Sequence, residues 1–330
     1  MKTMVRDDER ATISLPNAAD QQTLKIDTIL VPIDFSPASM EMLGYAAEFA
    51  KRFEAAVHLI HVYPPDEAGL VPGAGDLMPQ TAEELFCHQL SPSHREKVGS
   101  LSPCNCHTRS GAAYQAICEL AREIKADLIV LATRGHTGLK RVLLGSTAER
   151  VVRVASCAVL VVRQKKQKSR VHARRGTLQV GFNVRKILVP VDFSQCSLAG
   201  AMHAALLAKA LDATACFIHV LYPPGSVLVD RVSGEKSRRD ELERADARLN
   251  MEAFMKLDFL RGIKSESEIR TGYPIDVICA ESSRPDIDLV VTSTHGRTGF
   301  DHMLLGSVAE HVVRYAECPV MVVPSRCPKP

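Results

Sequence analysis

The chain has 330 residues, about twice the length of a typical domain, so two cores of roughly 140 residues each are expected. Its net charge of +3 and pI near 8.3 are too balanced to suggest a nucleic-acid partner. No stretch approaches the ~20 continuous apolar residues of a membrane span, and the N-terminus lacks an apolar signal core, so we expect a cytoplasmic protein without a membrane partner.

From residue 25 onward, after an N-terminal tail of residues 1–24, short apolar runs alternate with helical patterns. This alternation is typical of β-α-β units with a parallel sheet. The runs are rich in Val, Ile and Leu, which predicts an α/β fold whose sheet is covered by helices on both faces. The predicted strands are Thr28–Ile33, Ala56–Val62, Cys104–Arg109, Asp127–Ala132 and Cys157–Arg163 in the first half, and Lys186–Val191, Ala215–Leu221, Ser265–Arg270, Asp288–Ser293 and Cys318–Pro324 in the second.

Two kinds of helix start are visible in the sequence. Ser36 followed by Pro37 predicts an N-cap and a first helical residue, because proline has no N–H group to lose there. Ser146 and Ser307 each precede a glutamate by three residues, which is the spacing of a capping box.

Three connecting segments carry less information. Pro64–Ser102 and Tyr222–Gly262 are expected to hold one helix each and little chemistry. Residues 163–176, which overlap a basic linker of residues 164–184, carry seven Lys or Arg and no acid. We interpret the segment as a solvated linker. The alternative is a weak contact with nucleic acid or an anionic surface, but no aromatic residue is interleaved to stack on bases.

The two halves of the chain repeat each other. Gly135–Val162 and Gly296–Val323 share 17 of 28 aligned residues, and Ile29–Ser36 (ILVPIDFS) returns as Ile187–Ser194 (ILVPVDFS). Such self-similarity marks an internal duplication. We therefore predict two repeated domains, residues 25–163 and residues 185–326.

Candidate ligand-binding residues follow two of the predicted strands in each half. The first strand ends at Pro32, Ile33 and Asp34, and the fourth ends at Ala132 before a turn that leads to Gly145. Ligands of a parallel sheet bind at these strand ends, where the strand order reverses. A glycine lets the backbone approach a ligand, and a helix N-terminus favours phosphate. An aspartate for a sugar hydroxyl and a glycine turn for phosphates would make a nucleotide site.

A structural reading of the same residues remains open. In that reading, Asp34 and Ser36 do no more than start a turn and cap a helix, and the hydroxyl of Ser146 is used in the capping box. The pattern recurs in the second half as Asp192 with Gly306 and Ser307, which favours a site. The turns also exchange an arginine and a histidine, with TRGHTG in one half and THGRTG in the other. Both would suit an anionic ligand.

At these residues the chain resembles a tandem universal stress protein, with the similarity covering nearly all of residues 27–163 and 185–325. Nucleotide-binding members of that family carry a glycine, two residues, a second glycine, nine residues and then Gly-Ser or Gly-Thr. The second and third glycines correspond to Gly135 and Gly145 here, and to Gly296 and Gly306 in the other half. The first glycine is replaced in both halves.

The resemblance implies a five-stranded parallel sheet of order 3-2-1-4-5 in each half and pairing of the last strands as an internal pseudo-dimer. A further homodimer remains open. It also implies ATP or another adenine nucleotide, with or without magnesium, at the strand ends. The residues implied to bind nucleotide are Pro32, Ile33, Asp34, Val57, Ala132, Arg134, Gly135, Gly145, Ser146 and Thr147 in the first half, and Pro190, Val191, Asp192, Ala215, Ser293, His295, Gly296, Gly306, Ser307 and Val308 in the second.

Three functional hypotheses follow. The first is a stress-response module that binds adenine nucleotide and changes its protein partners with occupancy. The second is an interaction protein of the same fold without nucleotide, which the replacement of the first glycine by Ala132 and Ser293 favours. The third is a slow ATPase, although no Walker, GxGxxG, HExxH or GxSxG motif is present.

The ten cysteines are irregularly spaced, and several lie in apolar runs, as Cys157 and Cys318 do. They fit small buried residues in a reducing compartment better than a disulfide framework. Within 21 residues, however, six side chains are of the kinds that zinc prefers, although their spacing matches no standard zinc motif. Metal binding remains open for Cys87, His88, His94, Cys104, Cys106 and His107.

Overall fold

The computed structural model describes residues 23–63, 82–92, 103–133, 144–163, 183–223, 236–294 and 305–324. The strands in these ranges are β1 (Thr28–Pro32), β2 (Ala56–Tyr63), β3 (Cys104–Ser110), β4 (Leu128–Ala132), β5 (Ala158–Val162), β6 (Lys186–Pro190), β7 (Thr214–Leu221), β8 (Ser265–Thr271), β9 (Leu289–Ser293) and β10 (Val320–Val323). Their ends differ from the predicted strand ends by no more than two residues.

The helices alternate with these strands along the chain. They are α1 (Pro37–Phe53), α2 (Ala82–Gln89), α4 (Ala113–Glu123), α5 (Ser146–Val154), α6 (Gln195–Leu211), α7 (Lys236–Phe254), α8 (Pro274–Ser282) and α9 (Ser307–Tyr315), with a short 3-10 helix, η1, at Asp258–Leu260. Each long connection thus contains a helix, α2 in one half and α7 in the other. No helix in the described ranges has the length and apolar character needed to cross a bilayer.

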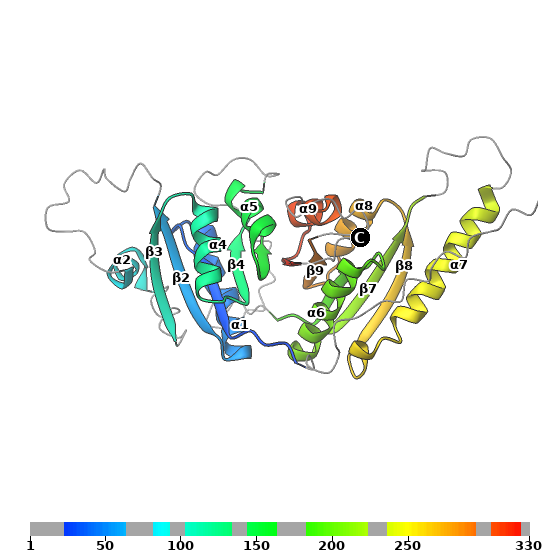
Figure 1. Ribbon diagram of the computed structural model, residues 1–330, viewed down its shortest axis with the longest axis horizontal. Coiled ribbons are helices and arrows are strands. Elements are labelled where there is room, and N and C mark those ends of the chain that lie inside the picture. Colours follow the sequence, from blue (N-terminus) through cyan, green and yellow to red (C-terminus); the bar gives the residue numbers. More distant parts are fainter. Residues whose placement is uncertain are drawn as a thin grey trace, which may run out of the picture.

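The strands form a single sheet of ten in the order β3-β2-β1-β4-β5-β10-β9-β6-β7-β8 (Figure 1). Each half has the predicted order 3-2-1-4-5. Within each half all neighbouring strands are parallel; in the first, for example, Ile29 of β1 is in register with Val57 of β2 and Leu128 of β4. The predicted α/β class and strand order are confirmed.

The two halves meet through their last strands. β5 and β10 pair antiparallel, with Met321 opposite Leu160, and both side chains are fully buried. An apolar edge strand left unpaired is prone to aggregate. Pairing β5 with β10 across a pseudo-two-fold axis leaves neither strand as an exposed edge. The predicted internal pseudo-dimer is confirmed.

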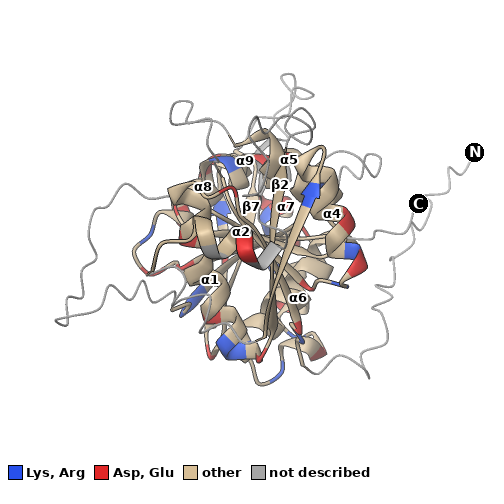
Figure 2. Ribbon diagram, turned by 90° about the vertical axis from the view of Figure 1, so that its left-hand side faces the viewer, with Lys and Arg blue, Asp and Glu red and all other residues tan. Residues whose placement is uncertain are grey.

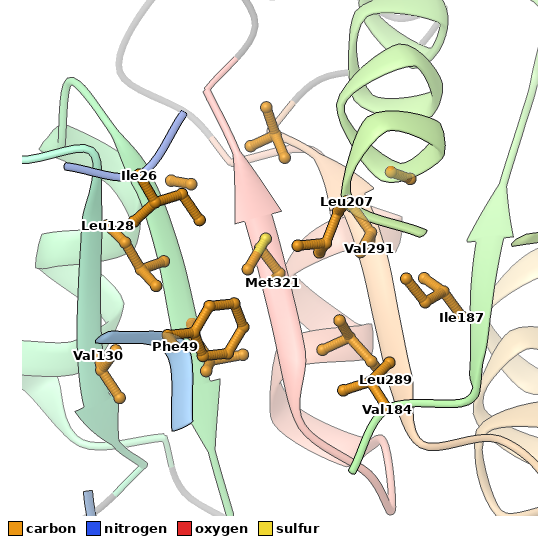
Figure 3. Close-up of a cluster of buried hydrophobic side chains, with 14 of the residues drawn as sticks. Ile26, Phe49, Leu128, Val130, Val184, Ile187, Leu207, Leu289, Val291 and Met321 are labelled. Atoms are coloured by element: carbon orange, nitrogen blue, oxygen red, sulfur yellow. The ribbon is translucent and has the colours of Figure 1, made fainter. Parts of the chain in front are cut away.

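Helices cover both faces of this continuous sheet. The strand residues alternate between the two faces, so that in β4 Leu128 and Val130 pack on one side while Ile129 and Leu131 pack on the other. Helices α1, α2, α6 and α7 cover the first face, and α4, α5, α8 and α9 cover the second. Figure 3 shows the first face, where Phe49 of α1 lies on one side of Met321 and Leu207 of α6 on the other. This core therefore runs across the junction between the halves.

Charged side chains join α5 to α9 above the junction, where the two helices lie side by side (Figure 1). Arg153 contacts Glu149 at 2.7 Å and reaches Glu310 across the junction at 3.6 Å. Arg314 makes the matching pair, with Glu310 at 3.0 Å and Glu149 at 3.6 Å. The four side chains are about one-quarter exposed, so solvent weakens the pairs. The four side chains therefore link α5 to α9 but contribute only modestly to stability.

The two kinds of predicted helix start have different outcomes. Ser36 and Ser194 are N-caps whose hydroxyls accept from the amides of Ser39 and Ser197, as expected for Ser36. The capping-box prediction for Ser146 and Ser307 is wrong. Each serine is the first helical residue, the N-cap is the preceding glycine, and no side chain in the described part of the chain caps the helix.

Seven cysteines of the described ranges are not disulfide-bonded, among them the buried Cys118, Cys216 and Cys318. These three agree with the expectation of small buried residues, whereas Cys104, Cys106, Cys157 and Cys279 are half-buried. Cys196 departs from it, since it is disulfide-bonded.

Candidate functional site

The crevice of each half lies where its strand order reverses. β1 has β2 on one side and β4 on the other, so the carboxyl ends of β1 and β4 diverge into helices on opposite faces of the sheet. β6 and β9 repeat this arrangement in the second half. Such a switch point is where open parallel sheets bind ligands. We refer to the two places as the first and second crevices.

An aspartate is held at the end of the first strand in both crevices. Oδ1 of Asp34 accepts from the amide of Ser36 at 3.0 Å and from its hydroxyl at 2.6 Å. Asp192 accepts from Ser194 with the same two distances. Each aspartate therefore has the structural role that the sequence left open, because its carboxylate orders the turn into α1 or α6. The same bonds fix a carboxylate beside each crevice.

The residue after each aspartate has a left-handed backbone. Phe35 has φ of 60° and Phe193 has φ of 63°, a region that bulky residues rarely adopt. Strain of this kind is kept where the surroundings impose it, often at functional sites. In both halves a histidine ring packs against this phenylalanine, with ring centroids 4.9 Å apart at Phe35 and 4.5 Å apart at Phe193.

These histidines, His61 and His219, tie the first strand to the second. Nδ1 of His61 is 2.8 Å from the carbonyl oxygen of Ile33, and Nδ1 of His219 is 2.7 Å from that of Val191. The carbonyls that precede Asp34 and Asp192 are thus held from the neighbouring strand.

A glycine turn forms the other side of each crevice. The amide of Gly145 donates to the carbonyl of Thr133 at 2.7 Å, and the amide of Gly306 donates to that of Thr294 at 2.8 Å. The start of α5 or α9 is therefore held directly against the end of β4 or β9. The N-terminus of each helix, where the first N–H groups have no intrahelical partner, therefore lies at the crevice end of the sheet.

The hydroxyl residues of this turn are accessible. Ser146 and Ser307 are exposed, while Thr147 and Val308, one residue further, are half-buried. The first crevice thus has two hydroxyls in the first turn of its helix and the second crevice has one. Arg134, Gly135, His295 and Gly296, which were predicted to complete the turns, lie outside the described residues.

The residues that replace the first family glycine differ between the halves. Ala132 is half-buried and packs on the core under α1. Ser293 is 8% exposed and packs against α6, where a Cβ built on Gly200 would lie 3.2 Å from the Ser293 Cβ. Both side chains are thus associated with the helix layer that covers β1 and β6.

Two predicted site residues do not reach the crevices. Val57 and Ala215 lie near the start of β2 and β7, paired with Ile29 and Ile187, and neither has exposed surface. The crevice end of β2 is several residues further on, since Pro32 pairs with Ile60. The sequence alignment placed these positions at the wrong end of a buried strand, so their prediction as crevice residues is corrected.

The potential metal ligands are divided between two faces of the sheet. Cys104 and Cys106 pack toward α2, whereas His107 faces the other side and places its Nε2 2.8 Å from Nδ1 of His58. Burial and the neighbouring His107 lower the pKa of His58. His88 is exposed on α2, and His94 lies outside the described residues. No group of three or more metal-ligating side chains occurs among the residues that the structure describes.

Sequence reasoning missed Phe35, Phe193, His61 and His219. A signal for them was present, because both pairs recur at the offset of 158 residues that relates the two ILVP segments. Their importance depends on backbone conformation and on contacts between strands, neither of which a single sequence displays.

Comparison with known proteins agrees with this geometry. The universal stress protein family matches residues 25–163 and residues 183–324. A universal stress protein of Mycolicibacterium smegmatis is 26% identical over 310 residues, covering 90% of this chain and 97% of that protein. Another from Methanocaldococcus jannaschii is 37% identical over 147 residues, covering 42% of this chain and 83% of that protein.

Among solved structures, a universal stress protein from Archaeoglobus fulgidus has a TM-score of 0.59 and 18% identity, and covers 91% of this chain and 99% of that one. A putative universal stress protein from Pseudomonas aeruginosa has a TM-score of 0.60 at the same identity, covering 91% of this chain and 93% of that one. At this identity the likeness concerns the fold. With the family matched twice over most of its length, the chain belongs to the universal stress protein family, as a tandem member.

Proposed function

We propose that this protein is a cytoplasmic stress-response module that binds ATP or another adenine nucleotide in one or both crevices. The observation that carries the proposal is the uncapped N-terminus of α5, held by the bond from Gly145 to Thr133 at the point where the strand order reverses. Helix N-termini bind phosphate through their N–H groups and the helix dipole. The same arrangement at Gly306 makes α9 a second candidate.

Each part of the nucleotide would have its own contacts. Gly145, Ser146 and Thr147 would bind the phosphates, with magnesium offsetting part of their charge. Asp34 would accept from a ribose hydroxyl. Asp192, Gly306 and Ser307 would do the same in the second crevice. Because Val308 stands where the first crevice has Thr147, we expect tighter binding in the first.

The organisation that goes with this proposal is two nucleotide-binding domains, residues 25–163 and residues 185–326, joined by a linker of residues 164–184. Occupancy of the crevices would alter which proteins the module contacts. Lys and Arg are interspersed with Asp and Glu on the described elements in the view from α2 (Figure 2), which favours protein partners over a polyanion.

A second candidate is an interaction protein of the same fold without bound nucleotide. Ser293 favours it, because this side chain replaces the glycine that lets the family's backbone approach phosphates, and it is held in place against Gly200. The second half is therefore the more suitable one for such a role.

Thermal stability in the presence of ATP separates the two candidates. Magnesium ATP at ~100 times its Kd should add about 2.7 kcal/mol to the free energy of unfolding. A domain of this size should then melt several degrees higher. The nucleotide content of the purified protein, measured by absorbance and mass spectrometry, is the companion measurement. No shift up to millimolar ATP in a protein purified without nucleotide would leave the interaction protein as the function.

A further inference from the structure

Two cysteines lie side by side on one face of an edge strand. Cys104 and Cys106 are alternate residues of β3, in register with Val57 and Leu59 of β2, so their side chains leave the sheet on the same face. Both are half-buried and pack against the core that includes Phe86 of α2. Each residue is thus partly exposed to solvent, as a reaction with peroxides or small thiols requires.

The two thiol groups lie close enough to share a hydrogen bond. A hydrogen bond from Cys106 lowers the pKa of Cys104, although burial opposes it. Burial instead raises the pKa of Cys118 to about 11, of Cys157 to about 12 and of Cys216 to about 11. Because the thiolate is the reactive form, these three thiols serve as unreactive references within the same chain.

The strand spacing brings the pair within reach of a disulfide. A strand rises about 3.3 Å per residue, so alternate Cα atoms lie at most about 6.6 Å apart. Disulfides join Cα atoms about 4.4–6.8 Å apart and Cβ atoms about 3.5–4.5 Å apart. The pair falls near the upper Cα limit, so β3 must contract locally to bring the two Cβ atoms together. Since β3 is at the end of the sheet, it can contract without disturbing a second neighbouring strand. A bond formed near the geometric limit is also readily reduced.

The first half alone has this pair. The matching positions of β8, which have the same register with β7, are Ser265 and Ser267. The edge strand is thus retained in both copies while the sulfur chemistry is confined to one.

We propose that Cys104 and Cys106 form a reversible redox site that closes to an intrastrand disulfide. The oxidant is a hydroperoxide. A thiolate sulfur attacks the peroxide oxygen, breaks the O–O bond and becomes a sulfenic acid, with release of water or an alcohol. The second thiol then displaces the sulfenic oxygen as water and forms the S–S bond. Two electrons pass from the sulfurs to the peroxide, and a small thiol such as glutathione reverses the reaction.

Peptide mapping of the full-length protein tests this site. The reduced protein is treated with hydrogen peroxide, remaining thiols are alkylated, and each cysteine is quantified by mass spectrometry. Cys104 and Cys106 should be lost together at least about tenfold faster than Cys118, Cys157 and Cys216. The product should be a peptide that is linked internally and has lost two hydrogen atoms, and glutathione should restore both thiols.

Substitutions then assign the reaction to the pair. Cys104→Ser and, separately, Cys106→Ser should each abolish the internal link, whereas Cys118→Ser should leave it unchanged. Circular dichroism confirms that each variant is folded. Equal oxidation rates at all cysteines, a principal link to Cys87 or to another molecule, or an internal link that persists in Cys104→Ser would overturn the proposal.

Discussion

The two halves of this protein are the same at their crevices and different at their outer strands. Asp34 and Asp192 make the same hydrogen bonds to a following serine, and the glycine turns close with amide-to-carbonyl distances of 2.7 and 2.8 Å. Phe35 and Phe193 share an unusual backbone conformation. Features built from backbone geometry are thus retained in both copies.

The outer strands carry different chemistry on the same backbone. β3 has the dithiol on one face and the His58–His107 pair on the other. In place of the histidine pair, the second half has a network in which Lys186 contacts Glu266 and Asp286, and Arg284 contacts Glu268, Glu281 and Asp286. The comparison indicates that the sheet and crevices were kept after duplication, while the edges became free to diverge.

The largest effect should come from the junction that both halves share. Met321→Ala should cost about 2–5 kcal/mol in the free energy of unfolding, as for other buried large-to-small changes. Leu160→Ala, on the opposing strand, should cost a similar amount, and both halves should lose stability together. Chemical denaturation followed by a probe in each half measures this. If one half unfolded earlier while the other kept its wild-type midpoint, the two would not be stabilised as one sheet.

A half-buried histidine of α6, whose Nε2 is out of contact with solvent, should make the second half sensitive to acid. Burial lowers the pKa of His203 from 6.5 to about 4, and its Nε2 is among the described buried atoms without a hydrogen-bond partner. Below pH 6.5 the unfolded chain binds a proton that the folded state excludes. The free energy of unfolding therefore decreases as the pH is lowered. Between pH 7 and pH 5 the loss should be about 2 kcal/mol.

The first half supplies the control substitution for this histidine, because Tyr45 occupies the matching position. His203→Tyr should remove the loss between pH 7 and pH 5, measured as the difference in melting temperature from wild type at each pH. An identical pH dependence in the two proteins would show that His203 is not the group that titrates.

The N-caps of α1 and α6 should contribute equally to the free energy of unfolding. Ser36→Ala and Ser194→Ala should each cost about 1 kcal/mol, because each serine accepts from the third helical amide and bonds to an aspartate. Urea denaturation of the single variants compares them. Costs that differ severalfold would mean that the matching geometry of the crevices hides unequal support from the rest of each half.

The smallest effect concerns the replaced glycines. Ala132→Gly should tighten ATP binding in the first crevice by roughly threefold, which corresponds to less than 1 kcal/mol. Ser293→Gly should do so in the second, at the cost of the contact with Gly200. Stability is measured alongside affinity, because glycine in a strand costs about 0.5–1 kcal/mol. Unchanged affinities would mean that these side chains do not restrict the phosphates.

Most of the fold could be predicted from the sequence. The apolar runs are local signals for strands, and the repeat at an offset of 158 residues shows directly that the chain has two similar halves. The cap at Ser36 also follows from the sequence itself, whereas the pairing of β5 with β10 was implied by the family resemblance. The sequence could not show that Gly145, rather than Ser146, is the N-cap of α5, since this depends on the hydrogen bond from Gly145 to Thr133. Val57 was misplaced although the sequence held the information, because it is the second residue of the predicted strand Ala56–Val62 and the crevice lies at the carboxyl end of such a strand.

The central claim, that phosphate binds at the glycine turns, is tested most directly by titration calorimetry with magnesium ATP. Wild type is compared with Gly145→Val, Gly306→Val and the double variant. Both glycines have φ near −60° and ψ of 141°, which valine adopts without strain, so the fold should persist. We expect Gly145→Val to weaken binding by about tenfold or more, a loss of at least ~1.4 kcal/mol. Gly306→Val should have a smaller effect, and the double variant should not bind. Wild-type affinity in the double variant, or no binding heat in any of the four proteins, would contradict the claim.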